Sequence, residues 1–181
     1  VTEPPGRFGG IAIASRHALE PRPLSAEMAP FAFRYQAVGV AALNLELRSV
    51  YAPLHQDPYR EFWSSMLRDL AAESHEPVLV CGDFNAGARG LDSPAPDVFC
   101  ATYFSQLPAS GYKDLWREVH GLEAREHTWH GRTYPYRLDH AFGSASVAER
   151  LRGCVYDHGV RERKLSDHSL LSIELGAPLV G

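Results

Sequence analysis

The chain has 181 residues, of which 45% are hydrophobic and 22% are charged, so it can bury one sizeable core but hardly two. Its net charge of -4 argues against a surface built for tight, nonspecific binding to nucleic acid, although a local basic patch is compatible with it. The sequence lacks an 18-residue apolar run and a signal-like segment, and its three cysteines are scattered. We expect a single domain over residues 1–181, with reduced thiols, no membrane span and a cytoplasmic location.

The first third of the chain predicts strands. An apolar run covers residues 10–15, and apolar residues alternate with polar ones over 31–36 and again over 43–47. The last of these strands continues to Tyr51 and stops at Pro53.

A helical period follows between Asp57 and Ser74, with Asp57 as the N-cap and Pro58 as the first helical residue. The run Pro77–Cys81 predicts a buried strand that continues to Asp83, and two further helices are expected near residues 98–107 and 112–120.

The remaining third predicts more strands. Residues 128–130 and 137–142 are expected to pair across a short loop, and residues 165–175 form a last strand. Strands outnumber helices but still interleave with them. The sequence therefore predicts an α/β fold, a layered β-sandwich flanked by helices.

Polar residues suited to catalysis stand at the edges of these strands. Asp83 and Asn85 follow one strand, Asp139 lies in the next acidic motif, and Asp167-His168 precedes the last strand. Oxygen ligands of this kind suit Mg²⁺ or Mn²⁺. The acids are far apart in the sequence, so their convergence is an inference.

Three further side chains are of the types that a metal-dependent phosphoesterase needs. Hydrolysis of a phosphate ester requires a group that orients water, donors to the phosphoryl oxygens and help for the leaving oxygen. Asn85, His168 and Tyr51 have suitable side chains. His168 can stay charged if a second carboxylate, for instance Asp139, holds its other ring nitrogen.

Structural roles are the alternatives for each residue. Asp83 and Asn85 can form an Asx turn, Asp167-His168 can be a satisfied loop pair, and Tyr51 can be a half-buried strand end. The joint occurrence of these residues in this order favours a site.

The order of motifs resembles the endonuclease/exonuclease/phosphatase superfamily. The blocks that carry the resemblance are Gly-Gly-Ile-Ala-Ile-Ala-Ser, Ser-Val-Tyr-Ala-Pro, Gly-Asp-Phe-Asn, Arg-Leu-Asp-His-Ala-Phe and Leu-Ser-Asp-His-Ser. They cover nearly the whole chain and are most similar to exonuclease III and the abasic-site endonucleases. The resemblance implies a DNase I-like fold.

The resemblance also implies a role for each matching residue. Asp83 positions and activates the attacking water, Asn85 bonds a phosphate oxygen, and His168 contacts the phosphoryl group. Asp139 orients His168, Asp167 is a metal ligand, and Tyr51 stabilises the phosphate or the leaving oxygen.

Two further residues are expected to bind substrate. Trp129 matches the tryptophan-bearing segment of the family, and Arg137 is a candidate phosphate contact, for which a solvated loop charge is the alternative. The implied reaction is in-line hydrolysis of a phosphodiester, with Mg²⁺ or Mn²⁺ and without a covalent intermediate.

The sequence departs from the family at its start. Family members begin with a strand bearing an asparagine and a strand ending in Gln-Glu, whose glutamate is a principal metal ligand, and Glu3 lies too close to the 10–15 segment to replace it. We expect an N-terminally incomplete domain that hydrolyses little in this form and more when extended upstream.

Three functions remain open. The first is a DNA endonuclease or exonuclease, monomeric in its full-length form. The second is a phosphodiesterase or phosphatase that acts on a phospholipid, an inositol phosphate or a nucleotide. The third is a noncatalytic module that has lost its metal site.

Overall fold

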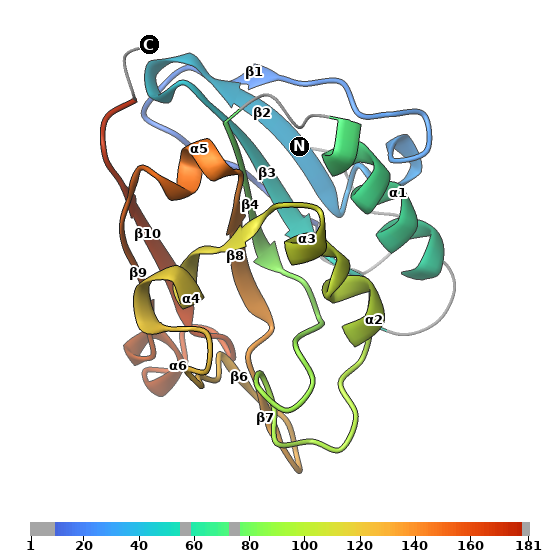
Figure 1. The fold of residues 1–181 in the computed structure, drawn as a ribbon, viewed down its shortest axis with the longest axis vertical. Helices are drawn as coiled ribbons and strands as arrows, with labels where there is room; N and C mark the ends of the chain where they lie inside the picture. The colour runs from blue at the N-terminus through green and yellow to red at the C-terminus, as the bar shows by residue number, and fades with distance from the viewer. Residues whose placement is uncertain (1–9, 55–58, 73–76, 179–181) are drawn as a thin grey trace.

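The computed structural model describes residues 10–54, 59–72 and 77–178, and its centre is a six-stranded sheet, here called the main sheet (Figure 1). The strand order is β1-β2-β3-β4-β8-β5. In chain order these strands are β1 (Glu20–Pro21), β2 (Tyr35–Val40), β3 (Leu45–Tyr51), β4 (Val78–Asp83), β5 (Lys113–Asp114) and β8 (Asp139–Gly143). β3 and β4 are parallel, and the other neighbours are antiparallel.

Two smaller strand pairs complete the fold. β9 (Leu151–Asp157) and β10 (Leu170–Leu175) form an antiparallel pair, here called the small sheet. β6 (Trp129–His130) pairs with β7 (Pro135–Tyr136) below the main sheet in Figure 1. The helices are α1 (Tyr59–Ala72), α2 (Ala101–Phe104), α3 (Gln106–Ala109), α4 (Leu115–His120), α5 (Ala145–Ala148) and α6 (Gly159–Glu162), with short 3-10 turns at Ala29–Phe31 and Ala41–Leu43.

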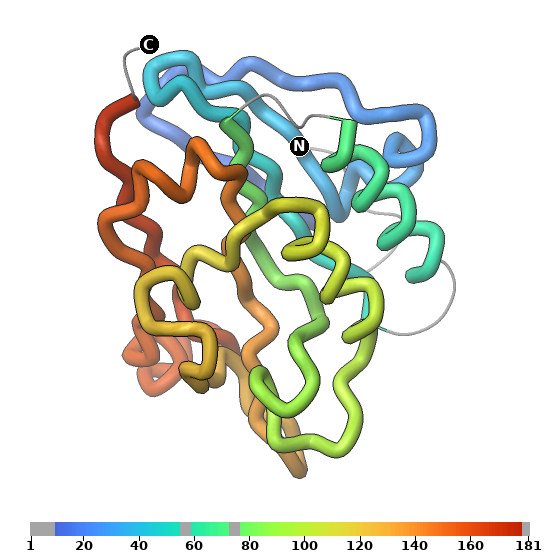
Figure 2. Tube along the Cα trace, in the orientation of Figure 1, coloured from blue at the N-terminus to red at the C-terminus, as the bar shows by residue number. Residues whose placement is uncertain are grey.

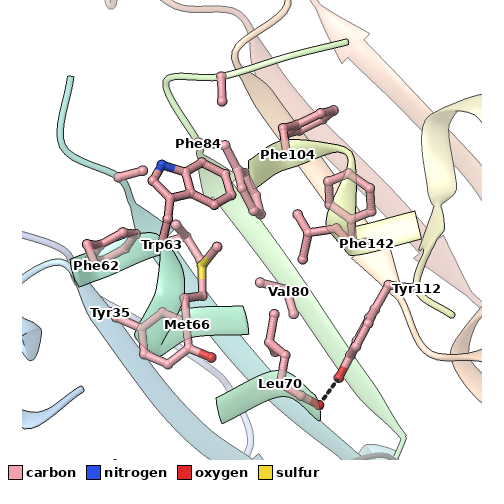
Figure 3. Packing of buried hydrophobic residues seen from close by; sticks show 14 of the residues in the cluster. Tyr35, Phe62, Trp63, Met66, Leu70, Val80, Phe84, Phe104, Tyr112 and Phe142 are labelled. Carbon is pink, nitrogen blue, oxygen red and sulfur yellow. Dashed lines mark hydrogen bonds between the residues drawn. The ribbon is translucent and has the colours of Figure 1, made fainter. Parts of the chain in front are cut away.

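The main sheet is buried on both faces, and strand alternation decides which residue enters which core. Val78 and Val80 of β4 pack with α1, α2 and α3 in an aromatic core that includes Trp63 and Phe84 (Figure 3). Leu79 points the other way, into a core shared with the small sheet. The predicted layered α/β sandwich is therefore confirmed, and its two cores lie on opposite faces of one sheet.

Several predicted elements are confirmed in the described residues. The strand that ends at Tyr51, the strand that ends at Asp83 and the helix of the 57–74 region are present. The proposed N-cap Asp57 and first helical residue Pro58 lie outside the described residues, as does Glu3. The two helices expected near 98–107 and 112–120 are present as shorter pieces.

Two early strand predictions were wrong. Residues 10–15 are not in a strand, because no neighbouring strand in the described part of the chain pairs with them. Residues 31–34 form a 3-10 turn and its continuation, and β2 begins only at Tyr35. Met28 and Phe31 are both buried and lie three positions apart, which is the period of a 3-10 turn.

Strand pairing was also predicted wrongly near the end of the chain. β6 pairs with β7, whereas β8 lies inside the main sheet between β4 and β5. Figure 2 shows the green segment of β4 beside the orange segment of β8, although the two are far apart in sequence. β9 was not predicted, because its exposed and half-buried residues give a weak pattern.

Candidate active site

A row of three residues crosses the main sheet at one end. Tyr51 on β3 is the register partner of Asp83 on β4, and Asp83 is the register partner of Asp139 on β8. Register partners point to the same face of a sheet. Alternation places this row on the face that carries Leu79 and the small sheet, and it turns His140 to the aromatic core.

The backbone after β4 fixes the carboxylate of Asp83. Its Oδ1 accepts a hydrogen bond of 2.9 Å from the backbone N–H of Asn85, which has a φ of 46°. The side-chain amide of Asn85 donates to the carbonyl of Ala52 at 2.8 Å. The Asx turn is therefore present, and it is also what holds Asp83 at the end of its strand.

His168 reaches this row from the loop that precedes β10. Its Nδ1 lies 2.8 Å from Oδ2 of Asp139. The backbone of Asp139 is itself held, because its N–H donates to Thr128 Oγ1 at 3.2 Å and its carbonyl accepts from the Tyr156 hydroxyl at 2.6 Å. The structure thus joins residues of both sheets in one hydrogen-bonded unit.

The electrostatics of this unit favour a cation. Burial and the nearby charge of Asp139 raise the pKa of Asp83 to about 7. Burial opposes charge on His168, but the hydrogen bond and charge of Asp139, with that of Asp83, outweigh it and raise the pKa of His168. Apart from the burial of Asp83, both shifts reflect the negative charges of the carboxylates that lie together at this end of the sandwich.

A metal ion fits the same residues. One ligand atom each of Asp83, Asp139 and His168 lies within 4.8 Å of the others, and the excess negative charge would be relieved by a cation. Carboxylate oxygens are the ligands that Mg²⁺ and Mn²⁺ prefer. Because Nδ1 of His168 already contacts Asp139, the carboxylates are the better ligands of the group.

Asp167, the metal ligand expected from the resemblance, stands at the margin of this group. It is exposed, and its Oδ2 accepts a hydrogen bond of 3.2 Å from the indole N–H of Trp129. It is not one of the three grouped residues, although its charge contributes to the raised pKa of Asp83.

An open, largely apolar cavity of about 380 Å³ adjoins the site. Its wall includes Asn85, Phe99, Trp129, Tyr136 and Leu138. Trp129 and Tyr136 face each other across the β6–β7 pair, with ring centroids 6.0 Å apart. Trp129 therefore lies where a group attached to a bound phosphate could contact it.

Arg137 occupies a different environment from the one expected of it. Its side chain is 0% exposed, with Nε 2.7 Å from Asp92 Oδ1 and Nη2 2.5 Å from Asp114 Oδ2. A side chain without exposed surface has nothing to offer a substrate in this structure. The expectation that Arg137 binds substrate is therefore corrected, and its role is structural.

Sequence reasoning missed several residues around the site. The guanidinium of Arg34 stacks over the Tyr51 ring at 4.8 Å and donates to the Tyr51 carbonyl at 3.3 Å. Buried Thr128 accepts from the backbone N–H groups of Leu138 and Asp139. No local pattern identifies either residue, because both act through strands that are distant in the sequence.

Two stacked sheets with acids and a histidine at one end define the DNase I-like class of α/β proteins. The profile of the Endonuclease/Exonuclease/phosphatase family matches residues 2–168, and the chain belongs to this family. The predicted family resemblance is confirmed.

Solved structures support the fold. The 3' phosphatase NExo from Neisseria, bound to a product DNA hairpin, aligns with a TM-score of 0.78 at 20% identity, over 89% of this chain and 72% of that one. An AP endonuclease from Archaeoglobus fulgidus aligns with a TM-score of 0.76 at 18% identity, over the same shares. At these identities the likeness concerns the fold.

A curated relative gives a sequence match. An exodeoxyribonuclease from Streptococcus pneumoniae is 25% identical over 136 residues, and the match covers 64% of this chain and 48% of that protein. The chain thus spans about half the length of the relative. Among the helices that the structure describes, none is long and apolar enough to cross a membrane.

Proposed function

We propose that this chain hydrolyses phosphodiester bonds in DNA in the manner of exonuclease III-type nucleases, with Mg²⁺ or Mn²⁺ as cofactor. The observation that carries the proposal is the row Tyr51–Asp83–Asp139, completed by His168 at 2.8 Å from Asp139. The family and the exodeoxyribonuclease relative support a nuclease.

Asp83 is the proposed residue that orients the attacking water and accepts its proton at a carboxylate oxygen. A carboxylate at this place suits this task, because a general base must lie within hydrogen-bond reach of the proton that it accepts. The Asx turn keeps one carboxylate oxygen occupied by the Asn85 N–H, so the other is free to face the water.

His168 is the proposed donor to the phosphoryl oxygens. Asp139 holds Nδ1, which leaves Nε2 as the nitrogen available to the substrate. The raised pKa of His168 favours the charged form, which stabilises negative charge that develops on the phosphoryl group.

Tyr51 and Asn85 flank the reacting phosphate in this proposal. Tyr51 is half-buried at the end of β3, beside Asp83 in register, and its hydroxyl would donate to the phosphate or to the leaving oxygen. One amide hydrogen of Asn85 binds Ala52, which leaves the second for a phosphate oxygen.

A divalent cation would be held by Asp83 and Asp139, with Asp167 at the margin. When bound, it would supply charge neutralisation for the phosphate and a lower pKa for water. The apolar cavity beside Trp129 would receive the sugar or base next to the scissile phosphate. Sugars and bases present flat apolar faces that aromatic walls bind well.

The test is a substrate panel with and without Mg²⁺ and Mn²⁺. It would contain an abasic duplex, single-stranded DNA, sphingomyelin and bis(p-nitrophenyl) phosphate. In a version of the chain extended upstream, we expect hydrolysis of DNA that EDTA abolishes and that Asp83→Ala lowers by at least about 10²-fold.

Each other outcome selects an alternative. Cleavage of sphingomyelin but not of DNA would make the chain a phospholipid phosphodiesterase, and DNA binding without metal-dependent turnover would make it a noncatalytic module. Unchanged turnover by Asp83→Ala would reject Asp83 as the residue that activates water.

A further inference from the structure

A second cavity lies beside the active site and has a different character. It measures about 400 Å³, and its wall consists of His130, Arg161, Lys164, Ser166 and Asp167. Arg161 belongs to α6, Lys164 follows it in the next turn, and His130 belongs to β6. We call this cavity the basic pocket.

The basic pocket is joined to the catalytic residues through its own wall. Ser166 Oγ accepts a hydrogen bond of 3.0 Å from the backbone N–H of His168, and Asp167 accepts one from Trp129. An isolated antiparallel β-bridge between Trp129 and His168 joins β6 to the same loop. A molecule in the pocket would therefore lie next to a phosphate bound at His168.

Arg161 has no carboxylate partner among the residues that the structure describes. Its Nη1 atom is buried and has no hydrogen-bond partner, and no ion pair of Arg161 is present in the described part of the chain. Nη1 itself has almost no accessible surface, so an anion in the cavity would contact the rest of the Arg161 guanidinium. The lack of an ion pair distinguishes Arg161 from Arg117 and Arg137, whose guanidinium groups are paired with Asp92.

The surroundings of the pocket are electropositive. Burial and then the charge of Arg161 lower the pKa of His130, and Arg161 also helps to lower the pKa of His127. Among the described wall residues only Asp167 is acidic. Glu126 does not line the cavity, and its Oε2 lies 3.5 Å from Nε2 of His158.

We propose that the basic pocket is a subsite for a second phosphate of the substrate, bound by Arg161 and Lys164 next to the phosphate that is hydrolysed. This proposal rests on the proposed function and restricts its substrate to a polynucleotide strand. A substrate with one phosphate would leave the subsite empty. Phosphate contacts from Arg and Lys position a nucleic acid without reading its sequence.

The turn after α6 fixes the backbone at Arg161 and Lys164. The backbone N–H of Lys164 donates to the Arg161 carbonyl at 2.9 Å, and the N–H of Leu165 donates to the Val160 carbonyl at 3.0 Å. Lys164 has a φ of 57°, a left-handed conformation that closes this turn. The cations are thus presented by a defined turn at the edge of the site.

The test compares two double variants of equal charge. Arg161→Gln with Lys164→Gln removes the proposed subsite. Arg152→Gln with Lys113→Gln removes one arginine and one lysine elsewhere: Arg152 lies at the start of β9, and Lys113 pairs with Gly143 at the end of β8 remote from Asp139. Binding of a fluorescein-labelled DNA hairpin is followed by anisotropy in Ca²⁺ across a salt series.

We expect the subsite variant to bind the hairpin about tenfold more weakly or worse, with the slope of log K against log salt reduced by about 1 to 2. The control variant should bind within twofold of the unmodified chain. Hydrolysis of bis(p-nitrophenyl) phosphate, which has one phosphate, should be unchanged in both variants.

Two results would overturn the subsite: hairpin binding that the subsite variant leaves unchanged, or an equal loss in the control variant. A parallel loss on bis(p-nitrophenyl) phosphate would also overturn it, since the pair would then act at the reacting phosphate. The chain could also bind the hairpin through Arg161 and Lys164 but hydrolyse neither the hairpin nor bis(p-nitrophenyl) phosphate. That result would reject the proposed function and leave the subsite standing.

Discussion

Nδ1 of His168 lies 2.8 Å from Oδ2 of Asp139, and this contact joins the main sheet to the loop that enters the small sheet. The two residues are brought together only when the sheets stack. The contact orients the imidazole, so that its other nitrogen is the one presented to the site.

Asp139→Asn should lower kcat for DNA by about 10² to 10³-fold, because it removes the charge that holds His168 and one carboxylate of the metal group. Steady-state kinetics check this. Glu149→Gln, an exposed acid distant from the site, is the matched control and should leave kcat unchanged. A kcat within threefold of the unmodified value would contradict the proposed role of Asp139.

Trp129→Ala should raise KM for an oligonucleotide by about 5 to 100-fold, because stacking of a base on an aromatic ring contributes roughly 1–3 kcal/mol. Trp129→Phe should retain most of this contact. Tyr134→Ala, on the same β6–β7 connection but outside the wall of the apolar cavity, is the control. Equal KM values for the three variants would remove Trp129 from substrate binding.

Arg137→Met should destabilise the fold by about 3–5 kcal/mol, because it leaves Asp92 and Asp114 half-paired in a buried place. Urea denaturation measures the change. Arg152→Met, at an exposed position, should change the free energy of unfolding by less than about 0.5 kcal/mol.

The buried-charge explanation has its own check. Adding Asp114→Asn to Arg137→Met should restore part of the lost stability, since Asp92 then keeps Arg117 as its ion-pair partner and no second buried carboxylate is left without one. A double variant that is less stable than Arg137→Met alone would show that packing, and not charge, sets the cost.

His140 should make the protein sensitive to mild acid. Burial, and next the charge of Arg137, lower its pKa to about 4, below the usual 6.5 of the unfolded chain. Between these values the unfolded state binds more protons, so the free energy of unfolding falls as pH drops from 6.5 towards 4, by up to about 1.4 kcal/mol per pH unit.

His140→Gln should remove this dependence. Its amide can still donate to the Ala86 carbonyl, which Nε2 of His140 contacts at 2.9 Å. Urea denaturation at pH 7 and pH 5 should then show a decrease that is smaller by roughly 2 kcal/mol than in the unmodified chain. His17→Gln, at an exposed position, is the control, and an equal decrease in all three proteins would contradict the assignment to His140.

Local pattern was enough for the elements that surround the site. The helical period of the 57–74 region predicted α1, and the apolar run before Asp83 predicted β4. Pattern was not enough for residues 31–34, where the sequence alternates as in a strand but the chain forms a 3-10 turn and its continuation. Pattern also failed to show that β6 pairs with β7, because a strand of two residues is too short to carry an alternating pattern.

By itself the sequence determined which residues are candidates for catalysis, because Asp83, Asp139 and His168 lie at predicted strand ends within family motifs, and side-chain type and local order are properties of the sequence. Only the tertiary structure decided how they meet. It placed β4 between β3 and β8, which aligned Tyr51, Asp83 and Asp139, and it buried Arg137 between Asp92 and Asp114 while leaving Arg161 beside the site. The physical reason is that sheet register and the pairing of buried charges are settled by packing across the whole chain, which no short segment encodes.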